Sequence, residues 1–170
     1  DTAVIYHDFA YFWYIAGDYD KALKYNEMAR SIEEELFAEY SITRMRSLNT
    51  KALVVWEQGK HQDADDIFEY IITTSEQMSS DYLPDVADFL FNYARCLHDQ
   101  DEDEKAKAQY LKCINIWSEM SEDGNRKLAL AHQEIADILR ISLSAVKKRL
   151  QRARNALKEN LKGGRENAIF

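Results

Sequence analysis

The sequence is poor in residues that interrupt helices. One proline and five glycines occur among 170 residues, and both residue types weaken regular structure when they fall inside it. Their scarcity favours long helices joined by short turns. At 46% hydrophobic residues, the chain can still bury the core of one domain or one compact array.

Cysteines and long apolar runs are also scarce. Cys96 and Cys113 have no metal-ligand spacing, so we expect reduced, buried thiols and a cytoplasmic protein. The longest apolar run, residues 9–16, falls far short of the ~18 residues of a spanning helix, so no membrane partner is expected. No signal peptide is visible. The chain opens on Asp1 rather than Met, which leaves open whether it is a fragment.

The sequence lacks recognisable catalytic, phosphate-binding and metal-binding motifs. The sequence has no glycine-rich phosphate loop, nucleophile elbow or paired-carboxylate motif, and its four histidines show no ligand spacing. Asp99, Asp101 and Asp103 alternate as at the start of a calcium loop, but Glu104 stands where that loop requires glycine. We therefore expect neither an enzyme nor a bound metal or cofactor.

Charge is divided unevenly along the chain. Residues 1–125 carry 11 basic against 26 acidic side chains, a net charge of −15, whereas residues 126–170 carry 11 against 4, a net charge of +7. This asymmetry predicts an acidic body that carries a basic interaction element.

An internal repeat with a period of 42 residues organises most of the chain. The alanines that repeat are Ala10, Ala52 and Ala94 before a predicted turn, and Ala22, Ala64 and Ala106 after it. Small residues in register on two helices let neighbouring helices approach closely, and a fixed period is typical of stacked helical hairpins.

The best copy, residues 17–29, begins with Gly17-Asp18-Tyr19 and places Ala22 and Ala29 on one helix face. It resembles the tetratricopeptide repeat (TPR), and the resemblance extends over about residues 3–120. It implies an all-α fold, a TPR-like right-handed α-solenoid of helical hairpins, and a peptide or protein ligand in its groove.

Eight helices are predicted, at about 3–16, 20–39, 42–58, 61–79, 84–99, 103–120, 127–140 and 143–162. They group into a TPR-like array over residues 1–122, a helix-turn-helix-like hairpin over 123–162 and a flexible tail over 163–170.

In this solenoid class the first helix of each hairpin lines the concave face. Counting from the repeat alanines gives these peptide-binding candidates: Tyr11, Arg46, Asn49, Trp56, Phe91, Asn92 and Arg95. An asparagine amide can both donate to and accept from an extended peptide. The alternative is that the polar side chains are merely solvated and that the rings fill space inside the array.

Residues 130–157 resemble the helix-turn-helix in region four of bacterial sigma factors, especially the extracytoplasmic-function type. The matching segments are residues 134–136, 138–139 and 141–142, followed by 146–147 and 152–154. The family implies a recognition helix over about 142–157 in the major groove of promoter DNA, or contact with RNA polymerase. The DNA-binding candidates are Ser144, Lys147, Lys148, Arg149, Gln151, Arg152 and Asn155.

A second interpretation of this segment remains open. Ala136 follows Ala94 by one repeat period, and Arg140 stands where the sigma turn carries glycine, so the hairpin could instead cap the solenoid. Our first hypothesis is a bacterial transcription regulator that binds a peptide or protein and DNA. The alternative is a TPR adaptor or scaffold with no nucleic-acid role. The sequence does not decide whether the chain forms a homodimer.

Overall fold

The computed structural model describes residues 2–38, 40–75, 77–119 and 124–138, the last of these by backbone alone over residues 124–126. Within these ranges the α-helices are α1 (Thr2–Ile15), α2 (Tyr19–Leu36), α3 (Ile42–Glu57), α4 (His61–Ser75), α5 (Leu83–Asp99), α6 (Asp103–Ser118) and α7 (Gly124–Ile138). A short 3-10 helix, η1 (Ser80–Tyr82), precedes α5. The predicted helix over 143–162 and the predicted tail lie outside the described residues.

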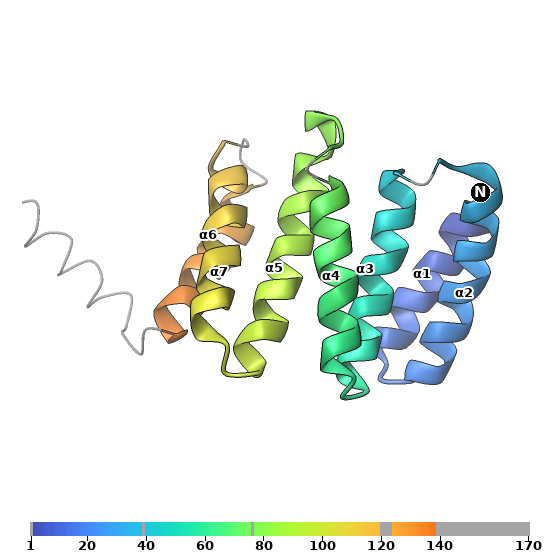
Figure 1. Ribbon diagram of the computed structural model, residues 1–170, viewed down its shortest axis with the longest axis horizontal. Helices are drawn as coiled ribbons and strands as arrows, with labels where there is room; N and C mark the ends of the chain where they lie inside the picture. Colours follow the sequence, from blue (N-terminus) through green and yellow to red (C-terminus); the bar gives the residue numbers. More distant parts are fainter. Residues whose placement is uncertain (1, 39, 76, 120–123, 139–170) are drawn as a thin grey trace, which may run out of the picture.

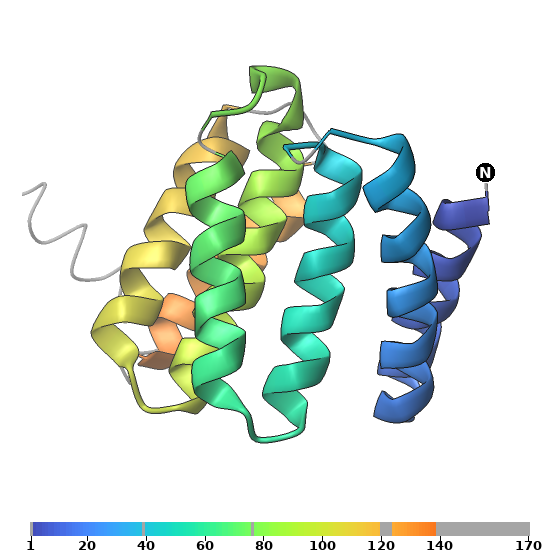
Figure 2. The ribbon, with the colours of Figure 1, turned by 45° about the vertical axis from the view of Figure 1, so that its right-hand side comes forward.

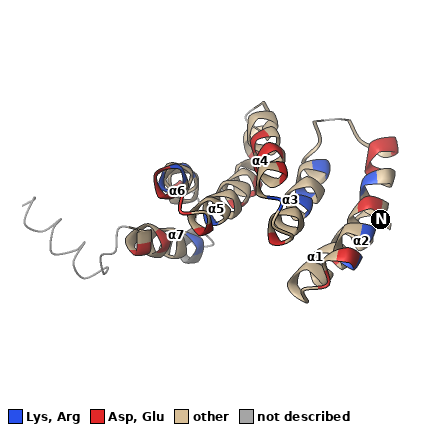
Figure 3. Ribbon diagram, turned by 60° about the horizontal axis from the view of Figure 1, so that its bottom comes forward, with Lys and Arg blue, Asp and Glu red and all other residues tan. Residues whose placement is uncertain are grey.

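The helices form antiparallel hairpins that stack side by side. The pairs α1–α2, α3–α4 and α5–α6 follow one another along the long axis, and α7 packs beside α6 (Figures 1 and 2). Viewed along the helices, the odd-numbered helices form one layer and the even-numbered helices the other (Figure 3). This arrangement confirms the predicted all-α, TPR-like solenoid.

The turns within the hairpins share one backbone conformation. Gly17 and Gly59 both have φ of 78°, and Asp101 at the equivalent place in the third hairpin has φ of 61°. A Cβ added at either glycine would meet nothing within 4 Å, so the left-handed backbone rather than lack of space favours glycine there. Aspartate tolerates this conformation better than most residues, and the third turn therefore keeps its geometry without glycine.

Side-chain caps fix where helices begin. The carboxylate of Asp18 accepts a hydrogen bond from the Lys21 N–H at 3.1 Å, and the Ser41 hydroxyl accepts one from the Arg44 N–H at 3.3 Å. Two helices end earlier than predicted. Helix α2 stops at Leu36 because Phe37 adopts an extended backbone with φ of −121° and ψ of 148°, and α4 stops at Ser75 before η1.

The repeat alanines are packing points between helices. All six (Ala10, Ala52, Ala94, Ala22, Ala64 and Ala106) are 0% exposed. The main core runs continuously through α3, α4, α5 and α6 to Ala131 of α7. The period read from the sequence is therefore the period of close helix approach.

Overpacking one such point should destabilise the array. We expect Ala64→Leu to lower the free energy of unfolding by about 1–3 kcal/mol, because extra methylenes force apart helices that touch at a buried alanine. Urea denaturation would measure the change. Ala108→Leu, at an exposed position of α6, is the matched control and should stay within ~0.5 kcal/mol of the wild type. Equal effects of both substitutions would contradict this packing.

A buried polar contact joins the first two hairpins. The Ser47 hydroxyl of α3 donates to Glu33 Oε1 of α2 at 2.7 Å, and the Asn26 amide donates to the Ser47 carbonyl at 2.8 Å. Glu33 is 0% exposed, and its Oε2 has no hydrogen-bond partner among the described residues. Burial raises the pKa of Glu33, while the hydrogen bond from Ser47 opposes the rise.

This raised pKa predicts a pH dependence of stability. The folded protein binds the Glu33 proton more tightly than the unfolded chain, so stability should fall as pH rises above the ordinary carboxyl value of 4.5. We expect Glu33→Gln to remove that part of the dependence and to stabilise the protein at pH 7 by about 1 kcal/mol. Thermal unfolding at pH 5 and 7 tests this, with Glu35→Gln, at an exposed position of α2, as the control. A Glu33 variant that parallels the wild type at both pH values would disprove the assignment.

Candidate peptide groove and nucleic-acid interface

Side chains of α1, α3 and α5 converge on a cavity of about 250 Å³. Its lining residues are His7, Tyr11, Arg46, Asn49, Thr50, Asp85, Asp88, Phe89 and Asn92. We call this cavity the groove. The structure therefore brings together four of the residues predicted to bind peptide: Tyr11, Arg46, Asn49 and Asn92.

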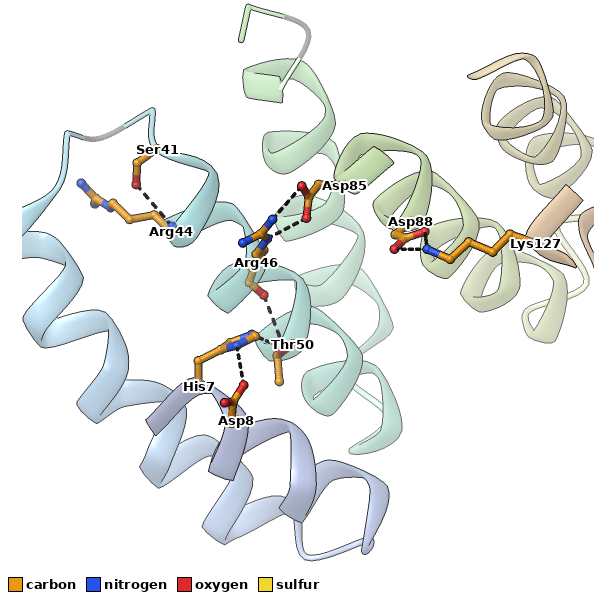
Figure 4. A network of polar contacts seen from close by, with 9 residues as sticks. All are labelled: His7, Asp8, Ser41, Arg44, Arg46, Thr50, Asp85, Asp88 and Lys127. Atoms are coloured by element: carbon orange, nitrogen blue, oxygen red, sulfur yellow. Dashed lines mark hydrogen bonds and ion pairs between the residues drawn. The ribbon is translucent and has the colours of Figure 1, made fainter. Parts of the chain in front are cut away.

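Two ion pairs join successive hairpins along the layer of odd-numbered helices. The Arg46 guanidinium of α3 donates to both carboxylate oxygens of Asp85 of α5, at 2.6 and 2.8 Å. The Lys127 ammonium of α7 donates to both oxygens of Asp88 at 2.6 Å (Figure 4). In the 42-residue register, Arg46 is equivalent to Asp88 and Asp85 to Lys127. The same contact thus occurs twice with its charges reversed.

A second set of polar contacts lies one helical turn further along the same helices. His7 Nε2 lies 3.2 Å from the Thr50 hydroxyl, and the Asn92 amide donates to Asn49 Oδ1 at 3.3 Å. Each pair again joins equivalent positions of successive hairpins. Arg46, Asn49 and Asn92 therefore hold neighbouring hairpins together, a role that the groove hypothesis from sequence did not include.

Part of the hydrogen-bonding capacity of the groove remains available. The donor atom of Asn49 and the carbonyl oxygen of Asn92 make no further hydrogen bonds to the described residues. Tyr11 is 48% exposed at the edge of the groove. Arg95, also exposed, lines a smaller adjoining hollow next to Asn92. These groups could contact the backbone and side chains of an extended peptide.

The two remaining predicted ligands are aromatic residues that pack mainly within their own hairpins. The Trp56 ring meets His61 edge-on at 5.4 Å while lining the smaller hollow. The Phe91 ring lies 5.5 Å from Tyr110 and 5.6 Å from Trp117 of α6. Phe91 is therefore directed toward α6, and it is not part of the groove lining.

Burial and hydrogen bonding shift the pKa values of several side chains in the groove and elsewhere in the array. Burial lowers the pKa of His7, with Asp8 opposing the shift, which favours a neutral imidazole beside Thr50. The hydrogen bonds that the Arg46 guanidinium donates to Asp85 raise the pKa of Arg46. Burial raises the pKa of Cys96 and of Cys113 to about 12, and such thiols are poor nucleophiles. Among the described residues, no His, Cys, Asp and Glu side chains are grouped to hold a metal ion.

Sequence reasoning missed the partners in these contacts. Neither Asp85 nor Lys127 was proposed as a site residue, whereas His7 was counted among the groove-facing side chains of the first helix. The available signal was numerical: ion-pair partners are 39 residues apart and hydrogen-bonded partners 43 apart. The first spacing is the 42-residue period less about one helical turn, and the second is the period plus one residue.

Helix α7 is the described part of the predicted DNA-binding hairpin. Ala131 and Ala136 are buried, and Leu128, Ile135 and Ile138 pack against the core of the array. All seven residues predicted to contact DNA, Ser144 to Asn155, lie outside the described residues.

These features define a solenoid of helical hairpins whose last described helix begins a basic segment. Residues 1–77 match the tetratricopeptide repeat family model, and residues 128–157 match the model of sigma-70 region 4. Both resemblances seen in the sequence are confirmed. Both families are non-catalytic.

Solved structures confirm the fold. A Podosopora anserina protein described as a kinesin light chain with nearly identical TPR-like repeats is 17% identical, with a TM-score of 0.63, and the match covers 82% of this chain and 74% of that one. A variant of it gives 18% identity and a TM-score of 0.60, covering 79% and 70%. No curated protein matches the chain. In the part of the chain that the structure describes, no helix has the length and apolar character to cross a membrane.

The reversed ion pairs make a test of the contacts between hairpins. We expect Arg46→Asp to destabilise the protein by about 0.5–1 kcal/mol, because it places a carboxylate opposite Asp85 at a half-exposed site. Adding Asp85→Lys should recover most of that loss, since the pair then has the polarity of Asp88 and Lys127. Urea denaturation of the single and double variants measures the coupling. Additive losses would show that the two side chains do not interact.

Proposed function

We propose that this protein is a transcription regulator in which the array binds a peptide or protein in the groove and the C-terminal hairpin contacts DNA. The main support for the proposal is that helix α7 belongs both to the stacked array and to the segment that matches sigma-70 region 4. Residues 128–138 are both the last described helix of the stacked array and the start of the sigma-70 region 4 match. A ligand in the array and a nucleic acid on the hairpin would then act on the same helix.

The contact between Asp88 and Lys127 supports this connection. It joins α7 to α5 beside the groove, where Asp88 is a lining residue. A cationic group on a peptide would compete with Lys127 for the Asp88 carboxylate. The groove is suited to an extended peptide that offers backbone hydrogen bonds to the asparagine amides and positive charge to the aspartates.

The distribution of charge also supports DNA contact by the C-terminal hairpin rather than by the array. The segment of residues 126–170 has a net charge of +7, whereas the preceding 125 residues carry −15. DNA binding then requires the basic face of the hairpin to point away from the acidic array. Bacterial origin and a cytoplasmic location follow from the same proposal.

A second candidate function is that of an adaptor whose C-terminal hairpin only caps the array. The burial of Ala131 and Ala136 favours it, because α7 packs in the repeat register of a further hairpin. On this interpretation the basic residues after α7 keep the end of the array soluble, and the groove alone has a binding partner.

A salt titration of duplex DNA binding by the full chain distinguishes the two functions. If the hairpin binds DNA, log K should fall with log salt at roughly −0.9 per phosphate contacted. Lys147→Ala should reduce the slope by about one unit and weaken all sequences alike. Arg152→Ala should also relax base preference, by ~1–3 kcal/mol. Fluorescence anisotropy measures each constant.

Lys24→Ala is the matched control, because it removes the same charge from an exposed position of α2 and should leave the slope unchanged. Absence of binding at low salt, or equal effects of the Lys24 and Lys147 substitutions, would favour the adaptor.

A further inference from the structure

A further cavity, of about 390 Å³, lies between the even-numbered helices α4 and α6, with α5 as its floor. We call it the outer pocket. Val86 and Leu90 of α5 line it and are at most 7% exposed, so the floor is apolar. The volume falls within the range of about 300–1,000 Å³ that is typical of small-molecule sites. The apolar lining residues are Ile72, Met78, Leu83, Val86, Leu90 and Ile116.

The repeat register accounts for this opening. Ser75 of α4 is equivalent to Glu33 of α2, one 42-residue period earlier. Between the first two hairpins the longer Glu33 side chain is fully buried and accepts a hydrogen bond from Ser47. Ser75 lines the outer pocket and is 4% exposed, and its hydroxyl has no hydrogen-bond partner among the described residues. The short serine therefore leaves unfilled the space that glutamate fills at the preceding interface.

The walls of the outer pocket also lack the charges of the first interface. Arg30 and Arg44 interact electrostatically with Glu33 and oppose the rise of its pKa. One period later the equivalent residues are Ile72 and Val86, both of which line the pocket. An interface that holds a carboxylate near two arginines is thus followed by an apolar space, which suits the hydrocarbon part of a ligand.

The polar groups of the outer pocket indicate the head group of that ligand. Lys112 and Asn115 of α6 are exposed lining residues, and neither side chain forms a hydrogen bond or ion pair with the described residues. Glu69 shares an adjoining cavity with Lys112 but does not pair with it. No acidic residue is among the described residues that line the outer pocket, although residues 1–125 carry 26 acidic side chains against 11 basic ones. A carboxylate could accept hydrogen bonds from the Lys112 ammonium, the Asn115 amide and the Ser75 hydroxyl.

We propose that the outer pocket binds a small amphiphilic carboxylate. The apolar chain lies against Val86 and Leu90, and the carboxylate meets Lys112 at the α6 side. Ser79, which also lines the pocket, is hydrogen-bonded to Asp81, so the head group belongs at α6 rather than beside this acid. The groove lies among the odd-numbered helices, so this site is separate from it, and the inference goes beyond the proposed peptide and DNA contacts.

A nuclear magnetic resonance titration of the ¹⁵N-labelled full chain with sodium decanoate tests the proposal. We expect amide shifts concentrated at the residues that line the outer pocket. The dissociation constant should be on the order of 0.1–1 mM, as suits a ligand of this size. Sodium octanoate, which is shorter by two methylene groups, should bind about tenfold more weakly because it buries less apolar surface.

Substitutions at the two ends of the outer pocket test the orientation of the ligand. Ser75→Glu supplies the side chain that fills the first interface and adds a like charge, so it should weaken decanoate binding at least tenfold. Lys112→Ala should weaken it about fivefold, whereas Lys112→Arg, which keeps the charge, should retain most of the affinity. The matched controls are Ser31→Glu and Lys24→Ala, both at exposed positions of α2, and they should leave the constant unchanged.

Circular dichroism of each variant checks folding. Leu83→Glu replaces Ser75→Glu if that variant fails to fold, because Leu83 lines the pocket and is 40% exposed. The proposal is overturned if decanoate causes no shifts, if the shifts spread over the whole surface, or if they centre on Asn49 and Asn92 in the groove. Undiminished binding by the Ser75 or Lys112 variants would also overturn it.

Discussion

The close approach of helices at the repeat alanines is the constraint on which the rest of the structure depends. A residue larger than alanine at these fully buried positions would separate the layers. Separation would also break the inter-hairpin contacts, since the hydrogen bonds and ion pairs across the groove span only 2.6–3.3 Å. The register of the alanines thus determines which side chains of α3, α5 and α7 face one another, and with that the composition of the groove.

Helix α7 has to satisfy two requirements at once. Its buried alanines and the residues packed beside them complete the apolar surface of the third hairpin. The same helix begins the segment that matches sigma-70 region 4. A helix committed to the array on one side has little freedom to reorient alone. Any movement of α7 would alter the ion pair between Lys127 and Asp88.

Much of the fold was predictable because its signals are local or periodic. The alanine period and the Gly17-Asp18-Tyr19 turn predicted the hairpins, and the helix starts were accurate because Asp18 and Ser41 are recognisable caps. The ends of α2 and α4 were less predictable, since both helices stop without glycine or proline. The left-handed turn at Asp101 also lacked its usual glycine, and only the period identified it.

The candidate site was predicted less completely, for a physical reason. Periodicity identifies the helix face on which Arg46, Asn49 and Asn92 lie, but not which atoms on that face find partners. That depends on the stagger between neighbouring hairpins, which emerges only when the helices are packed. Four of the predicted peptide-binding residues line the groove, and their contact with a peptide stays a prediction. The contacts with Asp85 and Lys127 became visible only in three dimensions. The DNA-binding candidates stay a prediction.

The alternating polarity of the ion pairs has a consequence for how the array assembles. The second hairpin presents a cation to an anion of the third, and the third presents an anion to a cation of α7. If folding skipped the third hairpin and joined the second directly to α7, Arg46 would face Lys127, and two positive charges would meet. Correct neighbours attract and this wrong pairing repels, so the charges distinguish the native order of hairpins from an omission that the shared repeat register would otherwise permit.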